Sequence, residues 1–322
     1  MPLPDRPPVI VLLGPTASGK TAAAVALARR LPIEVISADS RQIYRLMDIG
    51  TAKPTAQQQQ QCPHHFIDII DITDQYSAGE FATAARSLIP QLRERGKIPA
   101  IVGGSGLYIY ALCEGIFDFY RYPRKKIAKY RAKLEKQWRE QGIMPLYEKL
   151  QQVDPAAARR YADRNPRRII RALEFYLATG IPLSRAQQRR QPPPFQPLYF
   201  GIKLERSRLY ERINNRVYDM IDQGLVAEVR DILNRGYDPA LPALQTMGYK
   251  EIIDYLENRI SLETAIAQIQ RATRRYAKRQ QTWFKKYAPS TFWIESEDPD
   301  AIAEIIANQY FRILETQQKP LT

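Results

Sequence analysis

At 322 residues, the chain is long enough to bury one large core and a second, smaller one, so its stability does not require disulfides. A hydrophobic fraction of 44%, a charged fraction of 25% and the lack of an apolar stretch of roughly 18 residues predict an ordinary soluble protein without a membrane segment. Only Cys62 and Cys113 occur, in no CxxC pair, which excludes a disulfide framework and suits a reducing cytoplasm.

The first part of the chain alternates short apolar strands with helices. Residues 9–13 form an apolar run between Pro and Gly, and the alanine-rich residues 20–30 predict the helix that follows it. Further strands are expected over residues 34–38, 66–70 and 100–102, and a helix over residues 77–95. Strands that alternate with helices form a parallel sheet covered by helices, so the predicted fold class is α/β. The glutamine run at 57–61 is expected at the surface.

After Gly115 the pattern changes to charged helices, which end before Pro192-Pro193-Pro194, a typical linker. The helices are expected over residues 125–141, 144–152 and 166–179. We therefore predict a basic, all-helical insertion domain over residues 119–194, within a core made of residues 1–118 and 195–322. In the second part of the core, strands are expected over residues 199–204 and 292–294, and long helices over residues 207–235, 246–258 and 261–286.

The net charge of +14 is concentrated in the predicted insertion. Residues 1–118 hold 11 Lys and Arg against 11 Asp and Glu, whereas residues 121–190 hold 19 against 6, a net charge of +13. A solvated helical face accounts for most charge runs, but such a face usually carries both signs. The one-sided excess therefore favours a polyanion such as nucleic acid as the partner of this segment.

A phosphate-binding motif lies between the first predicted strand and the first predicted helix. The residues Gly14-Pro15-Thr16-Ala17-Ser18-Gly19-Lys20-Thr21 match G-x-x-x-x-G-K-[ST] at every position. In this motif, glycines let backbone amides turn toward phosphate oxygens, the helix N-terminus and Lys20 add positive potential, and the Thr21 hydroxyl can bind Mg²⁺. The motif predicts a phosphate site but not the ligand, because ATPases, kinases and other phosphate users share it.

Asp39 directly follows the strand expected at 34–38, at the edge of the sheet where ligands bind in open α/β folds. A carboxylate there can act as a metal ligand or a general base. The alternative is an aspartate that only caps its own turn. The strand at 100–102 ends in Gly103-Gly104-Ser105-Gly106, so it lacks the acidic metal ligand of a conventional ATPase.

Seven blocks of the sequence, in order, resemble the motifs of the tRNA dimethylallyltransferases. They are residues 14–21, Asp39-Ser40-Arg41-Gln42-Ile43-Tyr44, Gly50-Thr51-Ala52-Lys53-Pro54, residues 102–108, residues 167–174, Thr246-Met247-Gly248-Tyr249-Lys250-Glu251 and Lys278-Arg279-Gln280-Gln281-Thr282-Trp283-Phe284. The likeness runs from residue 9 to about residue 294. It implies a P-loop NTPase-like fold and a monomeric enzyme that uses Mg²⁺. The implied reaction transfers a dimethylallyl group from dimethylallyl diphosphate to the N6 amine of the adenine immediately 3′ of the tRNA anticodon, giving N6-isopentenyladenosine and diphosphate.

The resemblance also implies roles for individual residues. Asp39 is the candidate general base, and Lys20, Thr21, Ser105 and Arg216 complete the catalytic set. The diphosphate is held by residues 14–21 and by Arg216, which matches the family's diphosphate-binding arginine. The implied tRNA contacts are Asp39, Ser40, Arg41, Gln42, Ser105, Arg131, Arg167, Arg168, Ile169, Ile170, Arg171, Gln245, Thr246, Met247, Gly248, Tyr249 and Lys250. Ser105 stands where the family usually has threonine, which keeps the hydroxyl and removes one methyl group.

Two other functions stay open on the residues alone. A P-loop kinase of a nucleotide or small metabolite would consume ATP and leave the basic segment without a role. An RNA-binding protein switched by a nucleotide would form no covalent product. The run Cys62-Pro63-His64-His65 matches no common zinc spacing, so a packing role is favoured. Along residues 261–286, one face of apolar and aromatic side chains fits a core contact at least as well as an RNA contact.

Overall fold

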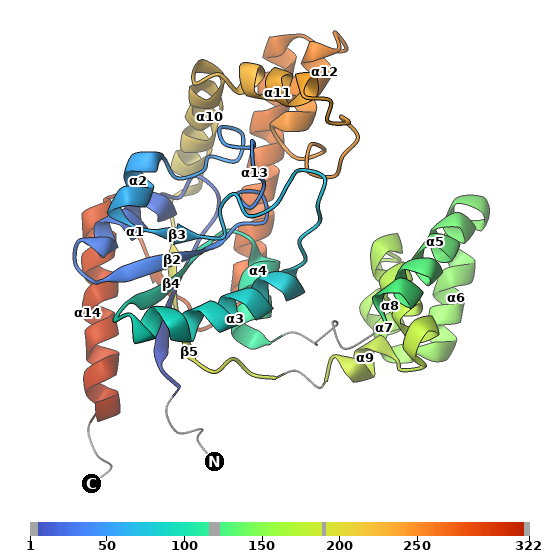
Figure 1. Ribbon diagram of the computed structural model, residues 1–322, viewed down its shortest axis with the longest axis horizontal. Helices are drawn as coiled ribbons and strands as arrows, with labels where there is room; N and C mark the ends of the chain where they lie inside the picture. The colour runs from blue at the N-terminus through green and yellow to red at the C-terminus, as the bar shows by residue number, and fades with distance from the viewer. Residues whose placement is uncertain (1–5, 116–122, 189–190, 319–322) are drawn as a thin grey trace. The chain divides into compact units, whose positions relative to one another are not determined.

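The computed structural model describes residues 6–115, 123–188 and 191–318 (Figure 1). The chain divides into two compact units, which we call the core unit (Met1–Cys113 and Pro193–Thr322) and the helical unit (Glu114–Pro192). The predicted start of the insertion at residue 119 lies outside the described residues, as do the basic residues Arg121, Arg189 and Arg190.

Six parallel strands form the sheet of the core unit, in the order β3-β2-β4-β1-β5-β6. They are β1 (Pro8–Leu13), β2 (Ile33–Ala38), β3 (His64–His65), β4 (Ile98–Gly103), β5 (Gln196–Ile202) and β6 (Phe292–Ile294). β1 lies between β4 and β5, with Val11 opposite Ile101 and Tyr199. Every residue of β1 is buried, because helices cover both faces of a parallel sheet, and this accounts for its uninterrupted apolar run. The predicted α/β class is confirmed.

Nine helices of the core unit are described (Figure 1). They are α1 (Lys20–Ala28), α2 (Ala56–Gln61), α3 (Ala78–Glu94), α4 (Gly106–Glu114), α10 (Arg206–Asp222), α11 (Leu225–Asn234), α12 (Tyr249–Leu256), α13 (Leu262–Tyr287) and α14 (Pro299–Gln318). α1 and α14 lie side by side and pack on one face of the sheet. A second apolar cluster joins α10, α11, α12 and α13 to residues 43–47. Among the described residues, no helix combines the length and apolar character that a membrane span requires.

Three predicted elements of the core unit are wrong in type or extent. Residues 66–70 do not form a strand, because Phe66 and Asp68 adopt left-handed backbone with φ of 66° and 56°, and only Ile70 pairs, through one bridge to Tyr44. The helix expected over 207–235 is two helices, because Gly224 turns the chain with a φ of 102°. The helix expected over 246–258 begins only at Tyr249.

The glutamine run forms α2, which buries none of its side chains. Thr55 starts this helix through a reciprocal cap, in which Gln58 N donates to Thr55 Oγ1 at 3.2 Å and Thr55 N donates to Gln58 Oε1 at 2.9 Å. Because α2 has no apolar face, the cap and the flanking chain hold it in place.

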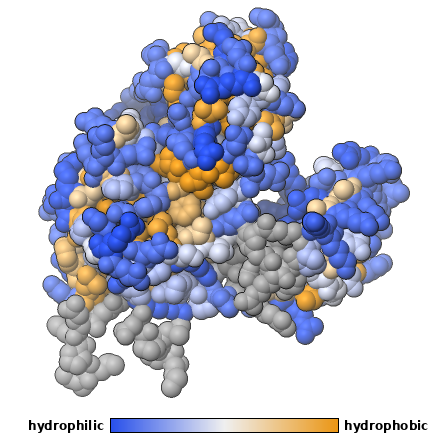
Figure 2. Space-filling view, viewed as in Figure 1, coloured by the Kyte–Doolittle hydropathy of each residue, from blue (hydrophilic) through white to orange (hydrophobic). Residues whose placement is uncertain are grey.

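The helical unit contains five described helices. They are α5 (Arg124–Gln141), α6 (Met144–Val153), α7 (Pro155–Arg160), α8 (Pro166–Thr179) and α9 (Leu183–Ala186). α8 is the centre of the unit's apolar cluster, with Ile169, Leu173 and Phe175 fully buried. It begins where Asn165 caps Arg168 N and ends at Gly180, which is left-handed. Hydrophilic side chains cover most of the visible surface of this unit (Figure 2).

Candidate active site

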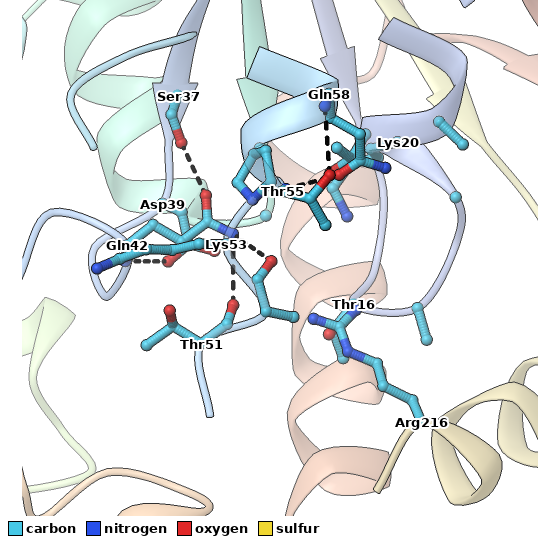
Figure 3. Close-up of a pocket in the computed structure, with 18 of the residues that line it drawn as sticks. Thr16, Lys20, Ser37, Asp39, Gln42, Thr51, Lys53, Thr55, Gln58 and Arg216 are labelled. Atoms are coloured by element: carbon cyan, nitrogen blue, oxygen red, sulfur yellow. Dashed lines mark hydrogen bonds between the residues drawn. The ribbon is translucent and has the colours of Figure 1, made fainter. Parts of the chain in front are cut away.

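A cavity of about 900 Å³ opens at the carboxyl-terminal edge of the sheet in the core unit (Figure 3). Three strand ends meet there, because the loop 14–21 follows β1, Asp39 follows β2, and Gly103-Gly104 end β4. Residues 48–59 and residues of α10 and α13 complete the wall. Ligands of open α/β sheets bind at this edge, so the cavity has the position and the size of a substrate site.

The loop 14–21 has the strand, turn and helix context that its motif requires. Ala17 and Gly19 adopt left-handed backbone, with φ of 62° and 93°, and α1 begins directly after Gly19. Thr16 N donates to Gln280 Oε1 at 2.9 Å, so this amide is already bonded within the protein. Ser18 Oγ is buried and has no hydrogen-bond partner among the described residues.

Lys20 lines the cavity and folds back on the loop, where its Nζ donates to Pro15 O at 2.7 Å. Burial and the positive charge of Arg216 lower the pKa of Lys20 to about 7, while the negative charge of Asp39 acts in the opposite direction. Near neutral pH the amine is therefore only partly charged. An anionic ligand in the loop would favour its protonated form.

Asp39 uses one carboxylate oxygen to shape its own turn. Oδ1 accepts from Arg41 N at 2.8 Å and from Gln42 N at 3.4 Å. Oδ2 accepts no hydrogen bond from the residues that the structure describes. Asp39 therefore caps its own turn through Oδ1, as the alternative prediction had it. Its other oxygen, Oδ2, stays available in the same cavity as Lys20 and the loop.

Ser105 lies buried beside Asp39, at the start of α4. Ser40 N donates to Ser105 Oγ at 2.9 Å, and Ser105 Oγ donates to Ser40 Oγ at 3.2 Å. The Ser105 hydroxyl therefore fixes the turn that carries Asp39. Tyr276 of α13 lies on the same side of the cavity, and burial together with the charge of Asp39 raises the pKa of Tyr276 to about 12.

Arg216 lies on α10 and extends toward Thr16 of the loop (Figure 3). Burial and the charge of Arg212 lower the pKa of Arg216, and Asp39 opposes this effect. Arg208 and Arg212 line the cavity too, although neither was predicted as a site residue. The four-residue spacing of Arg208, Arg212 and Arg216, which puts them on one face of a helix, is the signal that identifies them.

Gln280 is a third residue of the site that was not predicted from the sequence. Its side chain is buried, accepts from Thr16 N and donates through Nε2 to Gly104 O at 2.8 Å. One amide thus joins the phosphate-binding loop to the end of β4. Its signal in the sequence is a polar residue on the otherwise apolar and aromatic face of residues 261–286.

Glu228 of α11 holds the wall segment 48–50 through its carboxylate. It accepts from Asp48 N at 3.0 Å, Ile49 N at 2.7 Å and Gly50 N at 3.2 Å. It also accepts from Tyr249 Oη at 2.6 Å. Tyr249 packs so closely on Gly50 that a Cβ there would lie 2.5 Å from its ring, which requires glycine at residue 50. No sequence motif indicated this contact.

The predicted tRNA contacts of the core unit lie in two places: 39–42 and Ser105 lie beside the cavity, and 245–250 lie before and within α12. The Gln42 side chain is bonded internally, donating to the carbonyls of residues 51 and 52 and accepting from Ser37 Oγ. Gln245 and Lys250 are exposed, whereas Tyr249 is fully buried. The side chain of Tyr249 therefore supports this segment from inside and offers no surface to RNA.

The predicted tRNA contacts of the helical unit belong to α5 and α8. Arg131 forms two hydrogen bonds to the buried carboxylate of Glu174, at 2.6 and 2.8 Å, and Arg171 Nη1 donates to the same carboxylate at 2.8 Å. Arg167 and Arg168 are exposed. The side chains at 169–170 are buried in the apolar cluster, so the surface that this helix offers to RNA consists of its arginines.

Oxygen ligands for Mg²⁺ are present in the cavity. The Thr21 hydroxyl and the Asp39 carboxylate both line it, and Mg²⁺ commonly binds one or two protein oxygens together with substrate phosphates. Elsewhere, His64 Nδ1 lies 2.6 Å from Cys62 O, and His65 Nε2 lies 2.7 Å from Glu34 Oε2. Across the described parts of the chain, no three His, Cys, Asp or Glu side chains gather to hold a metal.

Comparisons with known proteins agree over most of the chain. The family model described as IPP transferase matches residues 42–287. A tRNA dimethylallyltransferase of Natranaerobius thermophilus is 43% identical over 311 residues, covering 94% of this chain and 92% of that protein. The tRNA dimethylallyltransferase 1 of Syntrophotalea carbinolica is 45% identical over 293 residues, covering 90% of this chain and 92% of that protein.

Solved structures give the same result. The full-length tRNA isopentenylpyrophosphate transferase of Bacillus halodurans superposes with a TM-score of 0.70 at 40% identity, covering 97% of this chain and 98% of that one. A eukaryotic dimethylallyltransferase acting on tRNA superposes with a TM-score of 0.84 at 27% identity, covering 98% and 81%. The chain therefore belongs to the IPP transferase family.

Proposed function

We propose that this chain is a tRNA dimethylallyltransferase, which transfers the dimethylallyl group of dimethylallyl diphosphate to the N6 amine of the adenine immediately 3′ of the anticodon. One observation carries the proposal. A single cavity holds a phosphate-binding loop, several basic side chains, Lys20 and Arg216 among them, and a carboxylate with an open oxygen, Oδ2 of Asp39. Prenyl transfer needs these three components together: a site for the leaving diphosphate, charge to stabilise it, and a base for the amine.

The reaction forms one N–C bond and breaks one C–O bond. The N6 lone pair attacks C1 of the dimethylallyl group, the C1–O bond breaks, and diphosphate leaves with the electron pair. Asp39 Oδ2 accepts the proton that N6 loses. The N6 lone pair is delocalised into the purine ring, so removal of this proton as the N–C bond forms lowers the barrier. Oδ1 keeps the carboxylate fixed meanwhile, because it accepts hydrogen bonds from Arg41 N and Gln42 N.

Charge develops on the departing diphosphate, and the cationic groups that face it are already in place. Lys20, Arg216 and the amides of the loop stabilise this charge, and groups that are positioned before the reaction need no rearrangement during it. Bound Mg²⁺, held by the Thr21 hydroxyl and the diphosphate, would supply further charge stabilisation. Ser105 acts on Asp39 indirectly, because its hydroxyl holds the Ser40 turn.

The target adenine must leave its stack to reach Asp39, at a cost of a few kcal/mol. Contacts to the rest of the anticodon stem-loop offset this cost. The exposed arginines of α8 and the basic excess of residues 121–190 suit the phosphates of the tRNA, whose counterions they would displace. We place the enzyme in the reducing cytoplasm, in keeping with a chain that has only two cysteines, both of them buried.

The test supplies the full chain with Mg²⁺, labelled dimethylallyl diphosphate and an unmodified anticodon stem-loop that carries adenine 3′ of the anticodon. A matched stem-loop carrying hypoxanthine at this position lacks the N6 amine. Label should enter the first RNA alone, with one diphosphate released for each label transferred. No transfer to the adenine RNA would refute the proposal, and ATP consumption without transfer would favour a kinase. ATP-dependent RNA affinity without a covalent product would favour a nucleotide switch.

A further inference from the structure

Arg212 of α10 reaches the phosphate-binding loop at Gly19. It lines the cavity, and its Nη2 atom lies 3.5 Å from the point that a Cβ on Gly19 would occupy. Gly19 is the last residue before α1, where the helix amides begin. A guanidinium at this point lies within reach of an anion that sits on the helix N-terminus.

Arg212 and its neighbour Arg208 differ in how far their hydrogen-bonding capacity is already used. Arg208 Nε lies 3.0 Å from both carboxylate oxygens of Glu297, and its Nη1 donates to Glu211 Oε2 at 2.6 Å. Arg212 has a longer contact, with Nη1 at 3.6 Å from Glu297 Oε2, and its side chain is 31% exposed. This distance allows an ion pair but is too long for a good hydrogen bond.

Positive charge accumulates around the loop. Arg212 lowers the pKa of Arg216, and Arg216 lowers the pKa of Lys20, so the three cations repel one another in the cavity. Asp39 is the carboxylate that opposes both shifts. Such a cluster of positive charges raises the free energy of the folded protein unless a polyanion neutralises it, and a diphosphate carries enough negative charge to do so.

We propose that Arg212 is a second diphosphate-binding arginine, and that Glu297 is its counter-ion in the free enzyme. This inference rests on the proposed function of the cavity. When a diphosphate occupies the loop, Arg212 turns from Glu297 to a phosphate oxygen, where its planar fork can form two hydrogen bonds. Glu297 then competes with the substrate for Arg212, so it reduces the affinity for diphosphate and favours release of the diphosphate product.

The test measures binding of inorganic pyrophosphate, with Mg²⁺, to the full chain by calorimetry. Arg212→Gln should weaken binding about 10- to 100-fold, the effect of losing hydrogen bonds to a charged group. Glu297→Gln should tighten binding several-fold, because Arg212 no longer has a carboxylate partner. Arg206→Gln is the matched control, because Arg206 lies on the same helix, is exposed and packs over the Tyr210 ring without lining the cavity. Its binding should stay within about twofold of the wild type.

Two outcomes distinguish this inference from the proposed function. If the wild type binds pyrophosphate and Arg212→Gln behaves like Arg206→Gln, the inference is overturned while the phosphate site stands. If the wild type does not bind pyrophosphate, the site itself is wrong and both proposals fail. Unchanged affinity in Glu297→Gln would overturn the role of the counter-ion. Arg212→Lys checks the geometry, because it keeps the charge without the fork and should recover only part of the loss. Equal tRNA affinity in all variants confirms that they are folded.

Discussion

Replacing Asp39 with asparagine removes a proton acceptor and a negative charge while leaving the turn intact. The amide oxygen of asparagine can still accept from Arg41 N and Gln42 N, which bond to Oδ1 at 2.8 and 3.4 Å. Alanine cannot, so Asp39→Ala would also lose two hydrogen bonds to a charged group, each worth about 1.5–3 kcal/mol. Asparagine is therefore the substitution that isolates the chemistry.

The expected loss in kcat for Asp39→Asn is about 10²- to 10⁴-fold, the usual contribution of a general base. This corresponds to about 2.7–5.5 kcal/mol in the activation free energy. The variant also loses the negative charge of Asp39, which raises the pKa of Lys20 and so opposes the lowering by burial. Without Asp39, the pKa of Lys20 falls from its value of about 7, so the variant should bind dimethylallyl diphosphate less well at pH 8 than at pH 6.5.

Single-turnover transfer of label to the anticodon stem-loop measures the chemical step directly, and a filter-binding titration gives the tRNA affinity separately. The base assignment predicts a large loss of the single-turnover rate with tRNA affinity within about threefold of the wild type. A rate close to that of the wild type would refute it. A loss of tRNA affinity that accounts for the whole defect would instead make Asp39 a binding residue.

Four further variants test other parts of the molecule. Because Lys20 is largely neutral at pH 8, the binding of dimethylallyl diphosphate should take up protons and should weaken as the pH rises from 6 to 8. Calorimetry in buffers of different ionisation enthalpy measures this proton uptake. Lys20→Arg should show none, because arginine stays charged over this range. Glu228→Gln replaces a carboxylate with an amide that cannot accept from every donor of the segment 48–50, so it should lower the free energy of unfolding by about 1–3 kcal/mol. A urea titration measures this change. An unchanged midpoint of the urea titration would show that the segment 48–50 does not depend on the Glu228 carboxylate. Arg167→Gln should reduce the salt dependence of tRNA affinity, by about 0.7–0.9 in the log–log slope, at unchanged thermal stability. Arg131→Gln removes two of the hydrogen bonds to the buried carboxylate of Glu174 and leaves it the one from Arg171, so this variant should also lower the melting temperature of the protein. Equal melting temperatures for the two variants would contradict this distinction.

Strands, loops and helices with a local sequence pattern could be predicted without the structure. The apolar run at 9–13 is a buried strand, and the motif at 14–21 forms its loop between that strand and α1, because glycine conformation and helix propensity act over a few residues. The α/β class followed from the order of these elements. Local signals failed at 66–70, where left-handed residues turn an apolar run away from the sheet, and at Gly224, where one glycine divides a helical pattern.

The resemblance assigned Asp39, Lys20 and Arg216 their roles, but tertiary structure decided how each of them is held. Gln280 lies 264 residues from Thr16 in the chain, and Glu228 lies about 180 residues from the segment that it anchors. Hydrogen bonds over such separations depend on how α11 and α13 pack, and no spacing in the sequence encodes them. For the same reason, only the structure shows that Arg131 and Arg171 share Glu174, that Tyr249 faces inward, and that Arg212 reaches the loop.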